Sequence, residues 1–492
     1  MSRGKVYLVG AGPGDEKLIT VRGIECLQQA DTVVYDRLAN PRLLRFAKPD
    51  AEFIFCGKFP KHHVLRQEAI NELLVQKARE GKRIIRLKGG DPSVFGRVGE
   101  EAAALADANI EYEIVPGITA GIAVPAYAGI PVTHREYGSS FALVTGHAKT
   151  EEGIPKADWS SLAGIDTVAF YMGVKNLPYI CESLLLHGRD PKTPIALISW
   201  GTTGRQRTVQ GTLEDIVARI KEAGITNPAI TLVGEIVKVR EHIQWFEKKP
   251  LFGRRILVAR TGAEPGNLAA ALAEQGADVV EYPYFSAHAV HSAALEETMR
   301  RSGQYAQILF TSPESVAFFF EAYQKTGKDI RALSATFYAL SARTARRLKE
   351  RGFTAEIATA PFSADDRWLI VGEESLAADK AQYEAAWGAC DIATVYKKKE
   401  RQEYNLNMVR LLKEEPVDTI VFPSAASVDA LVRFLERDGL ESTQVLQKAL
   451  LVCMGEAAAD ALRSAGCAVD RVAASPSIPD LLACITLQEA NC

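Results

Sequence analysis

The chain of 492 residues lacks the features of several protein classes. No apolar run approaches the roughly 20 residues that a membrane helix requires. The net charge is only −3, so the composition provides no bulk basic field for nucleic acid. An apolar segment begins at Lys5, with no signal peptide before it. We therefore expect neither a membrane nor a nucleic acid as a partner.

Paired cysteines and zinc-ligand spacings are absent as well. None of the eight cysteines forms a C-x-x-C pair, and no histidine stands at zinc-ligand spacing from one. Scattered cysteines in a long chain are typical of reduced thiols in a cytosolic protein. We therefore predict cytoplasmic localisation, no disulfide framework and no metal site.

The overall composition is that of an ordinary soluble globular protein, with 47% hydrophobic and 24% charged residues. The length exceeds one hydrophobic core and predicts two to four domains. Up to Pro250 there are 32 basic and 29 acidic residues, and after it 26 and 32. Any anionic substrate must therefore be met by local arginine and lysine clusters.

The most informative stretch is Ile84 to Arg97, with the sequence IIRLKGGDPSVFGR. Its apolar start predicts a buried strand, which breaks at Gly89-Gly90-Asp91-Pro92. Two glycines allow a backbone to approach a ligand closely. Open α/β sheets bind ligands at such loops, beyond the carboxyl ends of parallel strands. The alternative is a plain strand–turn–helix connection.

Other predicted strands also end in unusual residues. Gly10-Ala11-Gly12-Pro13-Gly14 follows an apolar strand, but its third glycine falls one position early for a dinucleotide fingerprint. Pro13 also removes a backbone donor, which argues against NAD. Asp36 follows Thr32–Tyr35 and either faces the same rim or caps a helix or pairs with Arg37. Lys58 follows a third strand.

Helices and strands alternate up to about residue 135, which predicts a parallel α/β sheet. We expect a helix after the N-cap Thr20 and another over Gln67 to Glu80. The later strands are joined by shorter helices and Gly-Thr-rich turns, and they predict a second, mixed-sheet subdomain. These strands are expected at 141–145, 167–172, 195–199 and 230–233.

Eight motifs, in this order, carry a family resemblance: GAGPGD, VVYDRL, CGK, RLKGGDPSVFGR, VPGITAGIAVPAYAGIPVTHR, VTGH, YMG and NPAITLVGE. Together they resemble the uroporphyrinogen-III C-methyltransferases, tetrapyrrole methylases that use S-adenosylmethionine. The resemblance covers about Lys5 to Trp245. It implies a two-subdomain methylase fold over residues 1–246 and a homodimer.

The resemblance also implies site residues. Cofactor contacts are expected from Pro13, Gly89, Gly90, Asp91, Val94, Thr119, Ala120, Met172 and Gly201. Asp36 would remove the proton that ring methylation releases, and Lys58 would return a proton or bind a substrate carboxylate. Uroporphyrinogen carries eight carboxylates, and the candidates for a basic rim are Arg37, Arg97, His134 and Arg135. Alternatively, Asp91 stabilises a turn and Met172 packs in the core.

A charged segment with Pro250 and Gly253 precedes a new strand at Ile256 and predicts a domain joint. Beyond it, Asp418–Ser424 echoes Gln307–Ser312, which indicates an internal duplication into two α/β lobes. This half, residues 251–492, resembles the uroporphyrinogen-III synthases. The resemblance implies one lobe from 251–283 and 397–492 and another from 284–396, with chain crossovers near 283–285 and 395–396.

The second half departs from the family pattern at one turn. The family's glycine is replaced by Ser341 in the first copy, and its threonine by Ala458 in the second. No histidine occurs after His291, so a histidine-based mechanism is not expected. Tyr396 is the candidate for a catalytic cleft residue, or alternatively a structural tyrosine. Ser312, Thr344 and Ser424 are candidates for binding substrate carboxylates.

We therefore predict a bifunctional tetrapyrrole enzyme. The C-terminal half would cyclise hydroxymethylbilane to uroporphyrinogen III, and the N-terminal half would methylate that product twice to precorrin-2. This reaction leads towards sirohaem or cobalamin. The alternatives are a methylase of a later precorrin, or a C-terminal half that binds tetrapyrrole without catalysis.

Overall fold

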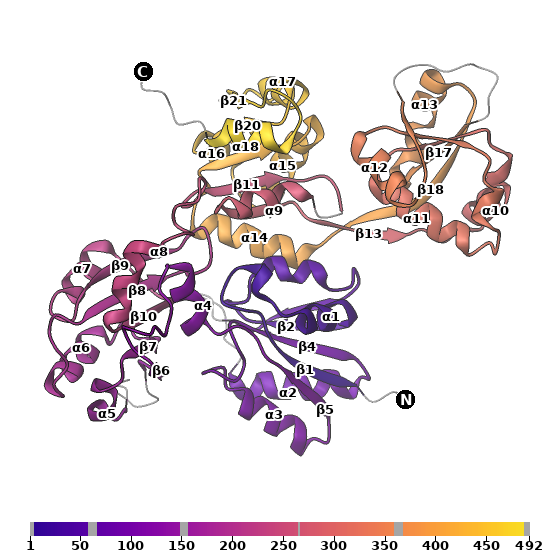
Figure 1. The fold of residues 1–492 in the computed structure, drawn as a ribbon. Helices are drawn as coiled ribbons and strands as arrows, with labels where there is room; N and C mark the ends of the chain where they lie inside the picture. Colours follow the sequence, from indigo (N-terminus) through magenta and orange to yellow (C-terminus); the bar gives the residue numbers. More distant parts are fainter. Residues whose placement is uncertain (1–3, 58–65, 148–155, 264–265, 359–367, 487–492) are drawn as a thin grey trace. The chain divides into compact units, whose positions relative to one another are not determined.

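The computed structural model describes residues 4–57, 66–147, 156–263, 266–358 and 368–486. These residues form four β-sheets with helices packed on them (Figure 1), which confirms the predicted α/β class. The chain divides into two compact units. Unit 1 consists of residues 1–259, 267–281 and 406–492 and contains three sheets, whereas unit 2 consists of residues 260–266 and 282–405 and contains the fourth.

The first sheet of unit 1 is parallel throughout, with strand order β3-β2-β4-β1-β5. Its strands are β1 (Lys5–Gly10), β2 (Thr32–Tyr35), β3 (Glu52–Phe55), β4 (Arg83–Lys88) and β5 (Glu111–Val115). Strand β1 lies between β4 and β5, so the connections after neighbouring strands diverge there. Such a divergence opens a ligand crevice beyond the carboxyl ends of the strands.

Helices cover this sheet and bury its strands. They are η1 (Glu16–Leu18), α1 (Val21–Gln29), η2 (Pro41–Phe46), α2 (Gln67–Arg79) and α3 (Val98–Asp107). Helix α4 (Ala120–Tyr127) follows β5 but packs on the second sheet, described next. Helix α1 begins where predicted, because the Thr20 hydroxyl accepts a hydrogen bond from the Gly23 amide at 3.1 Å. Leu8 of β1, Leu74 of α2 and Leu105 of α3 are fully buried in one hydrophobic core.

The second sheet has the order β6-β7-β10-β8-β9 and is mixed, as predicted. Its strands are β6 (Phe141–Thr145), β7 (Thr167–Tyr171), β8 (Pro194–Ser199), β9 (Arg207–Thr212) and β10 (Ala229–Val233). Only β6 and β7 pair in parallel. The helices that accompany it are α5 (Trp159–Ala163), α6 (Leu177–Leu186), α7 (Ile216–Ala223), η3 (Glu235–Val239) and α8 (Arg240–Ile243).

The third sheet completes unit 1 with the order β12-β11-β19-β20-β21. Its strands are β11 (Arg255–Ala259), β12 (Asp278–Tyr282), β19 (Thr419–Phe422), β20 (Leu450–Cys453) and β21 (Arg471–Val472). Its helices are α9 (Asn267–Glu274), α14 (Gln402–Glu414), α15 (Ala425–Arg437), α16 (Ser442–Gln447), α17 (Glu456–Ser464) and α18 (Ile478–Thr486).

The fourth sheet, of unit 2, has the order β13-β18-β17-β14-β15-β16. Its strands are β13 (Phe285–Ala289), β14 (Gln307–Phe310), β15 (Thr336–Ala339), β16 (Glu356–Ile357), β17 (Trp368–Glu373) and β18 (Cys390–Glu400). Its helices are α10 (Ala293–Arg301), η4 (Ser302–Gln304), α11 (Pro313–Gln324), η5 (Ile330–Ala332), α12 (Ala342–Glu350), η6 (Glu374–Asp379) and α13 (Lys380–Trp387). Phe310, Phe319 and Phe320 are almost completely buried at its centre.

The third and fourth sheets repeat one strand–turn–helix pattern, which supports the predicted duplication. In unit 2, β14 leads into α11, and Ser312 closes a capping box with Ser315. In unit 1, β19 leads into α15, and Ser424 closes the same box with Ser427. The pattern recurs in β15–α12 and β20–α17, where Ser341 and Gly455 are the respective N-caps.

The chain leaves the third sheet at Tyr282 and enters the fourth at Phe285. The return differs from the predicted second crossover at 395–396. Strand β18 continues without interruption to Glu400, and Tyr396 pairs with Ala289 of β13. The hydrogen bonds to β13 keep this segment in the fourth sheet, so the chain departs only after the strand ends.

Among the residues that the structure describes, no helix is both long and apolar enough to cross a membrane.

The aromatic core of unit 2 predicts a large stability effect. Replacing Phe310 by alanine removes a ring that lies 5.3 Å from Phe319 and 5.6 Å from Phe337, centroid to centroid. We expect a loss of about 3–5 kcal/mol in the free energy of unfolding of unit 2, measured by urea titration. The control is Ile357→Ala at an exposed position, where the change should stay within about 0.5 kcal/mol.

Candidate active site

A cavity of about 900 Å³ lies at the carboxyl ends of the strands of the first sheet. Loops after β7 and β8 of the second sheet line its opposite side, and residues of α9, β12 and α14 in the same unit complete the wall. This volume is at the upper end of the roughly 300–1,000 Å³ typical of small-molecule sites. The cavity has room for a ligand of considerable size.

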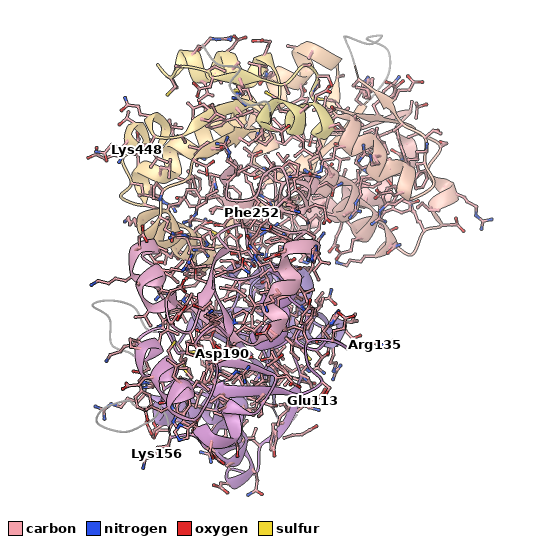
Figure 2. All side chains as sticks on the ribbon, turned by 60° about the vertical axis from the view of Figure 1, so that its left-hand side comes forward. Glu113, Arg135, Lys156, Asp190, Phe252 and Lys448 are labelled. Atoms are coloured by element: carbon pink, nitrogen blue, oxygen red, sulfur yellow. The ribbon has the colours of Figure 1, made fainter. Side chains whose placement is uncertain are left out.

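Most of the site residues expected in the N-terminal half line this cavity. All nine expected cofactor contacts do so: Pro13, Gly89, Gly90, Asp91, Val94, Thr119, Ala120, Met172 and Gly201. Asp36, Arg37 and Arg97 line it as well. His134 and Arg135 are not in the lining, and Arg135 is exposed at the periphery (Figure 2). Lys58 lies outside the described residues.

Three glycine-bearing loops meet at the floor of the cavity. The Gly12 amide donates to the Gly90 carbonyl at 3.2 Å, and the Gly90 amide donates back to the Gly12 carbonyl at 2.7 Å. Gly10 and Gly117 approach so closely that a Cβ on Gly10 would lie 2.6 Å from the Gly117 Cα. The glycines at these positions therefore permit loops from β1, β4 and β5 to touch.

Asp91 joins two of these loops. Its Oδ1 accepts from the Ser93 amide at 2.7 Å, and its Oδ2 accepts from the Gly117 amide at 2.9 Å. The turn-stabilising role that was the alternative for Asp91 is thus realised in the structure. This role is compatible with a contact between Asp91 and a ligand, because Asp91 also lines the cavity.

Gly89 and Gly90 differ in what a side chain would meet. A Cβ on Gly89 would lie 2.6 Å from the Leu38 Cβ, so Gly89 is required for packing. A Cβ on Gly90 would meet only the Ala120 amide nitrogen, 3.9 Å away, and would otherwise enter open space. Gly90 also has a φ of 70°, which disfavours other residues. The cavity wall at Gly90 is therefore bare backbone.

Asp36 presents its two carboxylate oxygens to different surroundings. Oδ1 accepts from the Leu38 and Ala39 amides at 3.1 and 3.2 Å, so this oxygen stabilises the turn after β2. Asp36 does not cap a helix, the first part of its alternative, because the N-cap of η2 is Asn40. Oδ2 lies 3.8 Å from Nη2 of Arg86, which is too long for a hydrogen bond. No described residue donates a hydrogen bond to Oδ2, so this oxygen is suited to accept a proton.

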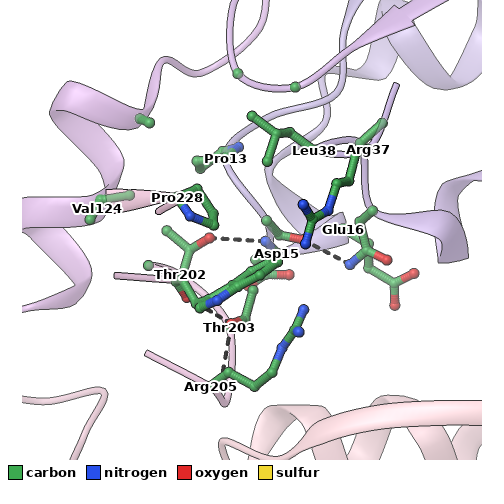
Figure 3. Close-up of a pocket in the computed structure, with 18 of the residues that line it drawn as sticks. Pro13, Asp15, Glu16, Arg37, Leu38, Val124, Thr202, Thr203, Arg205 and Pro228 are labelled. Atoms are coloured by element: carbon green, nitrogen blue, oxygen red, sulfur yellow. Dashed lines mark hydrogen bonds between the residues drawn. The ribbon is translucent and has the colours of Figure 1, made fainter. Parts of the chain in front are cut away.

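Polar contacts join the two subdomains across the cavity. The Asp15 amide donates to the Thr202 hydroxyl at 3.0 Å (Figure 3), and the Tyr127 hydroxyl donates to Asp15 Oδ2 at 2.8 Å. Burial, together with the negative charge of Asp15, raises the pKa of the Tyr127 phenol above its usual range. On the other side, the Tyr171 hydroxyl accepts from the Gly121 amide at 2.5 Å.

Backbone strain is concentrated around the cavity. Six non-glycine residues among those described have a positive φ, and five of them line the cavity: Phe95, Arg97, Met172, Trp200 and Thr202. Such conformations persist only where the surrounding structure imposes them, and they concentrate at functional sites. Met172 is 48% exposed, so the alternative that it packs in the core is wrong.

The arginines of the rim already have acidic neighbours. Arg97 makes a two-point contact with Glu100, with Nε and Nη2 at 2.7 and 2.6 Å from its two oxygens. This hydrogen bonding raises the pKa of Arg97. A substrate carboxylate at Arg97 would therefore compete with Glu100.

Sequence reasoning missed several cavity residues. Tyr171 stands in the YMG motif, but only the methionine was selected. Thr202 lies in the Gly-Thr-rich turn after β8 and was treated as a connection. Lys88 lies in the RLKGGDP motif, and the sequence analysis assigns it no role, although it is buried and lines the cavity. All three residues lie in stretches that the sequence analysis names. Whether their side chains reach the cavity depends on the tertiary fold.

None of the expected site residues of the C-terminal half is in the lining of this cavity. The Ser312 hydroxyl is 3.0 Å from the Tyr396 hydroxyl, so unit 2 brings these two together. Tyr396 is 2% exposed and stacks on Phe318. Thr344 is fully buried, with its hydroxyl 2.8 Å from that of Ser341. Ser424 belongs to unit 1 as the N-cap of α15.

The fold and the cavity define a class of protein. Its first part is an α/β fold with a small-molecule cavity between two subdomains, as in many enzymes. Its second part, later in the chain, is a duplicated α/β fold. Two family profiles match the chain. The tetrapyrrole (corrin/porphyrin) methylases match residues 5–217, and uroporphyrinogen-III synthase HemD matches residues 266–366 and 376–483.

Two relatives that span most of this chain agree with these matches. A uroporphyrinogen-III C-methyltransferase of Bacillus subtilis (strain 168) is 44% identical over 457 residues, which cover 93% of this chain and 92% of the relative. The porphyrin biosynthesis protein HemD of Ruminiclostridium josui is 36% identical over 483 residues, which cover 94% of each. A crystal structure of uroporphyrin-III C-methyl transferase from Thermus thermophilus with S-adenyl homocysteine is 38% identical over 48% of this chain and 100% of that chain, with a TM-score of 0.42.

The chain therefore belongs to the tetrapyrrole methylase family, in a form that carries a uroporphyrinogen-III synthase domain of the HemD type after the methylase. Both resemblances predicted from the motifs are confirmed.

The bare wall at Gly90 predicts a steric effect. Gly90→Val would place a branched side chain in the cavity and in a left-handed conformation, so we expect loss of S-adenosylmethionine binding, measured by calorimetry. The control is Gly224→Val, since Gly224 has a φ of 61° and open space around it but ends α7 outside the cavity lining. Both variants should lose about 1–2 kcal/mol of stability or more, but only the first should lose the cofactor. Normal binding by Gly90→Val would place the cofactor elsewhere.

Proposed function

We propose that the chain catalyses two consecutive reactions of tetrapyrrole synthesis. The C-terminal part, residues 251–492, closes hydroxymethylbilane to uroporphyrinogen III. The N-terminal part, residues 1–246, methylates that product twice with S-adenosylmethionine and forms precorrin-2. The observation that carries the proposal is the meeting of the β1, β4 and β5 loops, with the bare backbone of Gly90, at a cavity that Asp36 also lines.

The cavity fits S-adenosylmethionine better than a dinucleotide. Pro13 supplies no amide donor for a phosphate, and S-adenosylmethionine has no phosphate. The open space at Gly90 and the amide of Ala120 provide a surface of backbone against which the cofactor can lie. Pro13, Gly90, Thr119, Ala120 and Met172 would hold it. Bound S-adenosylmethionine would supply a methyl group from its cationic sulfur, and the rest of the cofactor would leave as a neutral thioether.

The residues of the chain then have two tasks. A pyrrole carbon is already electron-rich, so the cavity must mainly orient the substrate. Formation of the new carbon–carbon bond leaves a positive charge on the substrate, which is discharged by loss of a proton. We assign that proton to Oδ2 of Asp36, because Oδ1 is held by the Leu38 and Ala39 amides. Lys58 remains our candidate for returning a proton or binding a substrate carboxylate.

The substrate carboxylates require positive charge at the cavity rim. Arg37 is half exposed there, and Arg97 offers a planar guanidinium that can exchange Glu100 for a carboxylate. His134 and Arg135 lie further out, and we assign them a role only in attracting the anionic substrate.

In the synthase half, the task is to fold a linear substrate so that one ring closure is favoured. The contact between Tyr396 and Ser312 places two hydroxyl groups side by side at the N-terminus of α11. We assign Tyr396 to ring closure, and Ser312 and Ser424 to substrate carboxylates. Thr344 would need to turn away from Ser341 to do the same.

One observation favours a second candidate for this half, a domain that binds tetrapyrrole without closing it. Ser341 uses its side chain to cap α12, where the family has glycine, and its hydroxyl engages Thr344. In the second copy, Ala458 offers no hydroxyl at all. An anion at either turn would therefore lose a polar contact.

The assignment of Asp36 predicts a kinetic effect. Asp36→Asn keeps an oxygen for the Leu38 and Ala39 amides but removes the proton acceptor. We expect kcat for methylation of uroporphyrinogen III to fall about 10²–10⁴-fold, with unchanged affinity for S-adenosylmethionine. The control is Asp50→Asn at an exposed position outside the cavity lining, which should leave kcat unchanged. An active Asp36→Asn enzyme would exclude Asp36 as the base.

A coupled assay tests the two activities together. The full chain, given hydroxymethylbilane and S-adenosylmethionine, should accumulate a dimethylated type III product, identified by mass spectrometry and isomer analysis. Unmethylated type I isomer would contradict the synthase assignment and, if hydroxymethylbilane still binds, would favour the non-catalytic domain. A parallel reaction that starts from uroporphyrinogen III isolates the methylase, and failure there would point to a later precorrin as substrate.

A further inference from the structure

Four charged side chains form a cluster at the cavity of the first sheet, where Asp36 and Lys88 line the cavity and Arg86 and Glu101 lie behind them. Arg86 and Lys88 lie on β4, Glu101 lies on α3, and Asp36 follows β2. Arg86, Lys88 and Glu101 are 4%, 5% and 0% exposed. Charged residues are almost never buried to this extent unless they are paired, so the arrangement of the pairs matters.

The pairs share a single acceptor atom. Nε of Arg86 donates to Oε1 of Glu101 at 3.2 Å, and Nζ of Lys88 donates to the same oxygen at 2.8 Å. One carboxylate thus faces two positive charges, and Glu101 can balance only one of them. The second negative charge is Asp36, whose Oδ2 lies 3.8 Å from Nη2 of Arg86.

Arg86 is also held in place by the backbone. Its Nη1 donates to the Leu87 carbonyl at 3.3 Å and to the Val34 carbonyl at 3.5 Å. Strand β2 pairs with β4 so that Val34 stands beside Arg86. The guanidinium therefore lies at a defined place beside the end of β2, where Asp36 follows.

The titration behaviour agrees with this geometry. Burial acts to lower the pKa of Arg86, but the acidic groups around it, Asp36 and Glu101 among them, outweigh this effect, and the net change in pKa is upward. Burial, followed by repulsion from Arg86, lowers the pKa of Lys88. The shift for Arg86 thus favours its charged form beside Asp36.

We infer that Arg86 is a positioning residue for the methyl-transfer reaction, which acts by fixing the carboxylate of Asp36. The inference rests on the proposed role of Asp36 as proton acceptor. Amide donors hold Oδ1, and Arg86 attracts Oδ2 from a distance too long for a hydrogen bond. The carboxylate is thereby fixed in rotation, while the lone pairs of Oδ2 remain available for the proton. Glu101, which also accepts from Lys88, holds Arg86 in turn, and none of the three transfers a proton.

A double-mutant cycle on the full-length enzyme tests this inference. Arg86→Met and Arg86→Lys are made in the natural sequence and in Asp36→Asn, and kcat and KM for uroporphyrinogen III are measured together with the Kd for S-adenosylmethionine. We expect Arg86→Met to lower kcat about tenfold or more, with KM and Kd changed less than about twofold. Arg86→Lys should restore part of kcat because it retains the charge. In Asp36→Asn, the same Arg86→Met change should lower the residual kcat less than about twofold.

The control is Arg189→Met. Arg189 is a partly buried arginine of the second subdomain that donates to the carbonyls of Ala163 and Asp166, outside the cavity lining. Its loss should lower the melting temperature without changing kcat. Thermal unfolding of every variant separates loss of fold from loss of function. Arg86→Gln replaces Arg86→Met in the cycle if the latter does not fold.

The possible outcomes separate this inference from the proposed function. If Asp36→Asn itself leaves kcat unchanged, the assignment of the base is wrong. If Asp36→Asn lowers kcat and Arg86→Met lowers it equally in both backgrounds, Arg86 acts independently of Asp36 and the positioning role is wrong. The positioning role is also wrong if Arg86→Met changes KM or Kd instead of kcat.

Discussion

The close approach of three loops at the carboxyl ends of the first sheet is the constraint on which the site depends. Gly12 and Gly90 exchange two backbone hydrogen bonds, and Gly117 lies against both Gly10 and Gly90. A Cβ at Gly10 or Gly117 would collide with the neighbouring backbone. The loops therefore meet only because these positions lack side chains, and the same loops line the cavity at Pro13, Gly90 and Thr119.

The residues with strained backbone conformations lie around the same cavity. Phe95, Arg97, Met172, Trp200 and Thr202 adopt left-handed conformations around the cavity. Thr202 is held in this state by hydrogen bonds from its amide to Gln206 and to its hydroxyl from Asp15. The strained residues lie on both subdomains, so the cavity wall keeps its shape only while both remain folded against each other.

The charged side chains near Asp36 and those at the rim of the cavity differ in their burial. At the carboxyl end of β4, Glu101, Arg86 and Lys88 are buried and held by hydrogen bonds, so their arrangement is rigid. At the rim, Arg37 and Arg97 are about half exposed, and water screens their ion pairs with glutamates. A rigid charge suits the orientation of a reacting group, whereas exchangeable ion pairs suit a substrate that carries many carboxylates.

Much of this protein follows from local signals in its sequence. Apolar runs that end in glycine, such as Ile84 to Gly90, determine strands and the loops after them, because the hydrogen-bonding pattern and the absence of a Cβ are local properties. The N-caps Thr20 and Ser312 act within one turn of helix in the same way. The sequence also places Asp36 at a strand end. It does not show which of its two carboxylate oxygens accepts hydrogen bonds from the backbone.

Only the tertiary structure decided how the distant pieces combine. That Gly89 serves packing while Gly90 faces open space depends on Leu38, fifty residues earlier. That Lys88 and Arg86 share one oxygen of Glu101 depends on how α3 packs on β4. The continuation of β18 past Tyr396 depends on pairing with β13, more than one hundred residues away. In each case the deciding contact joins residues of different helices, strands or loops, from 13 to more than one hundred positions apart, and no local pattern records it.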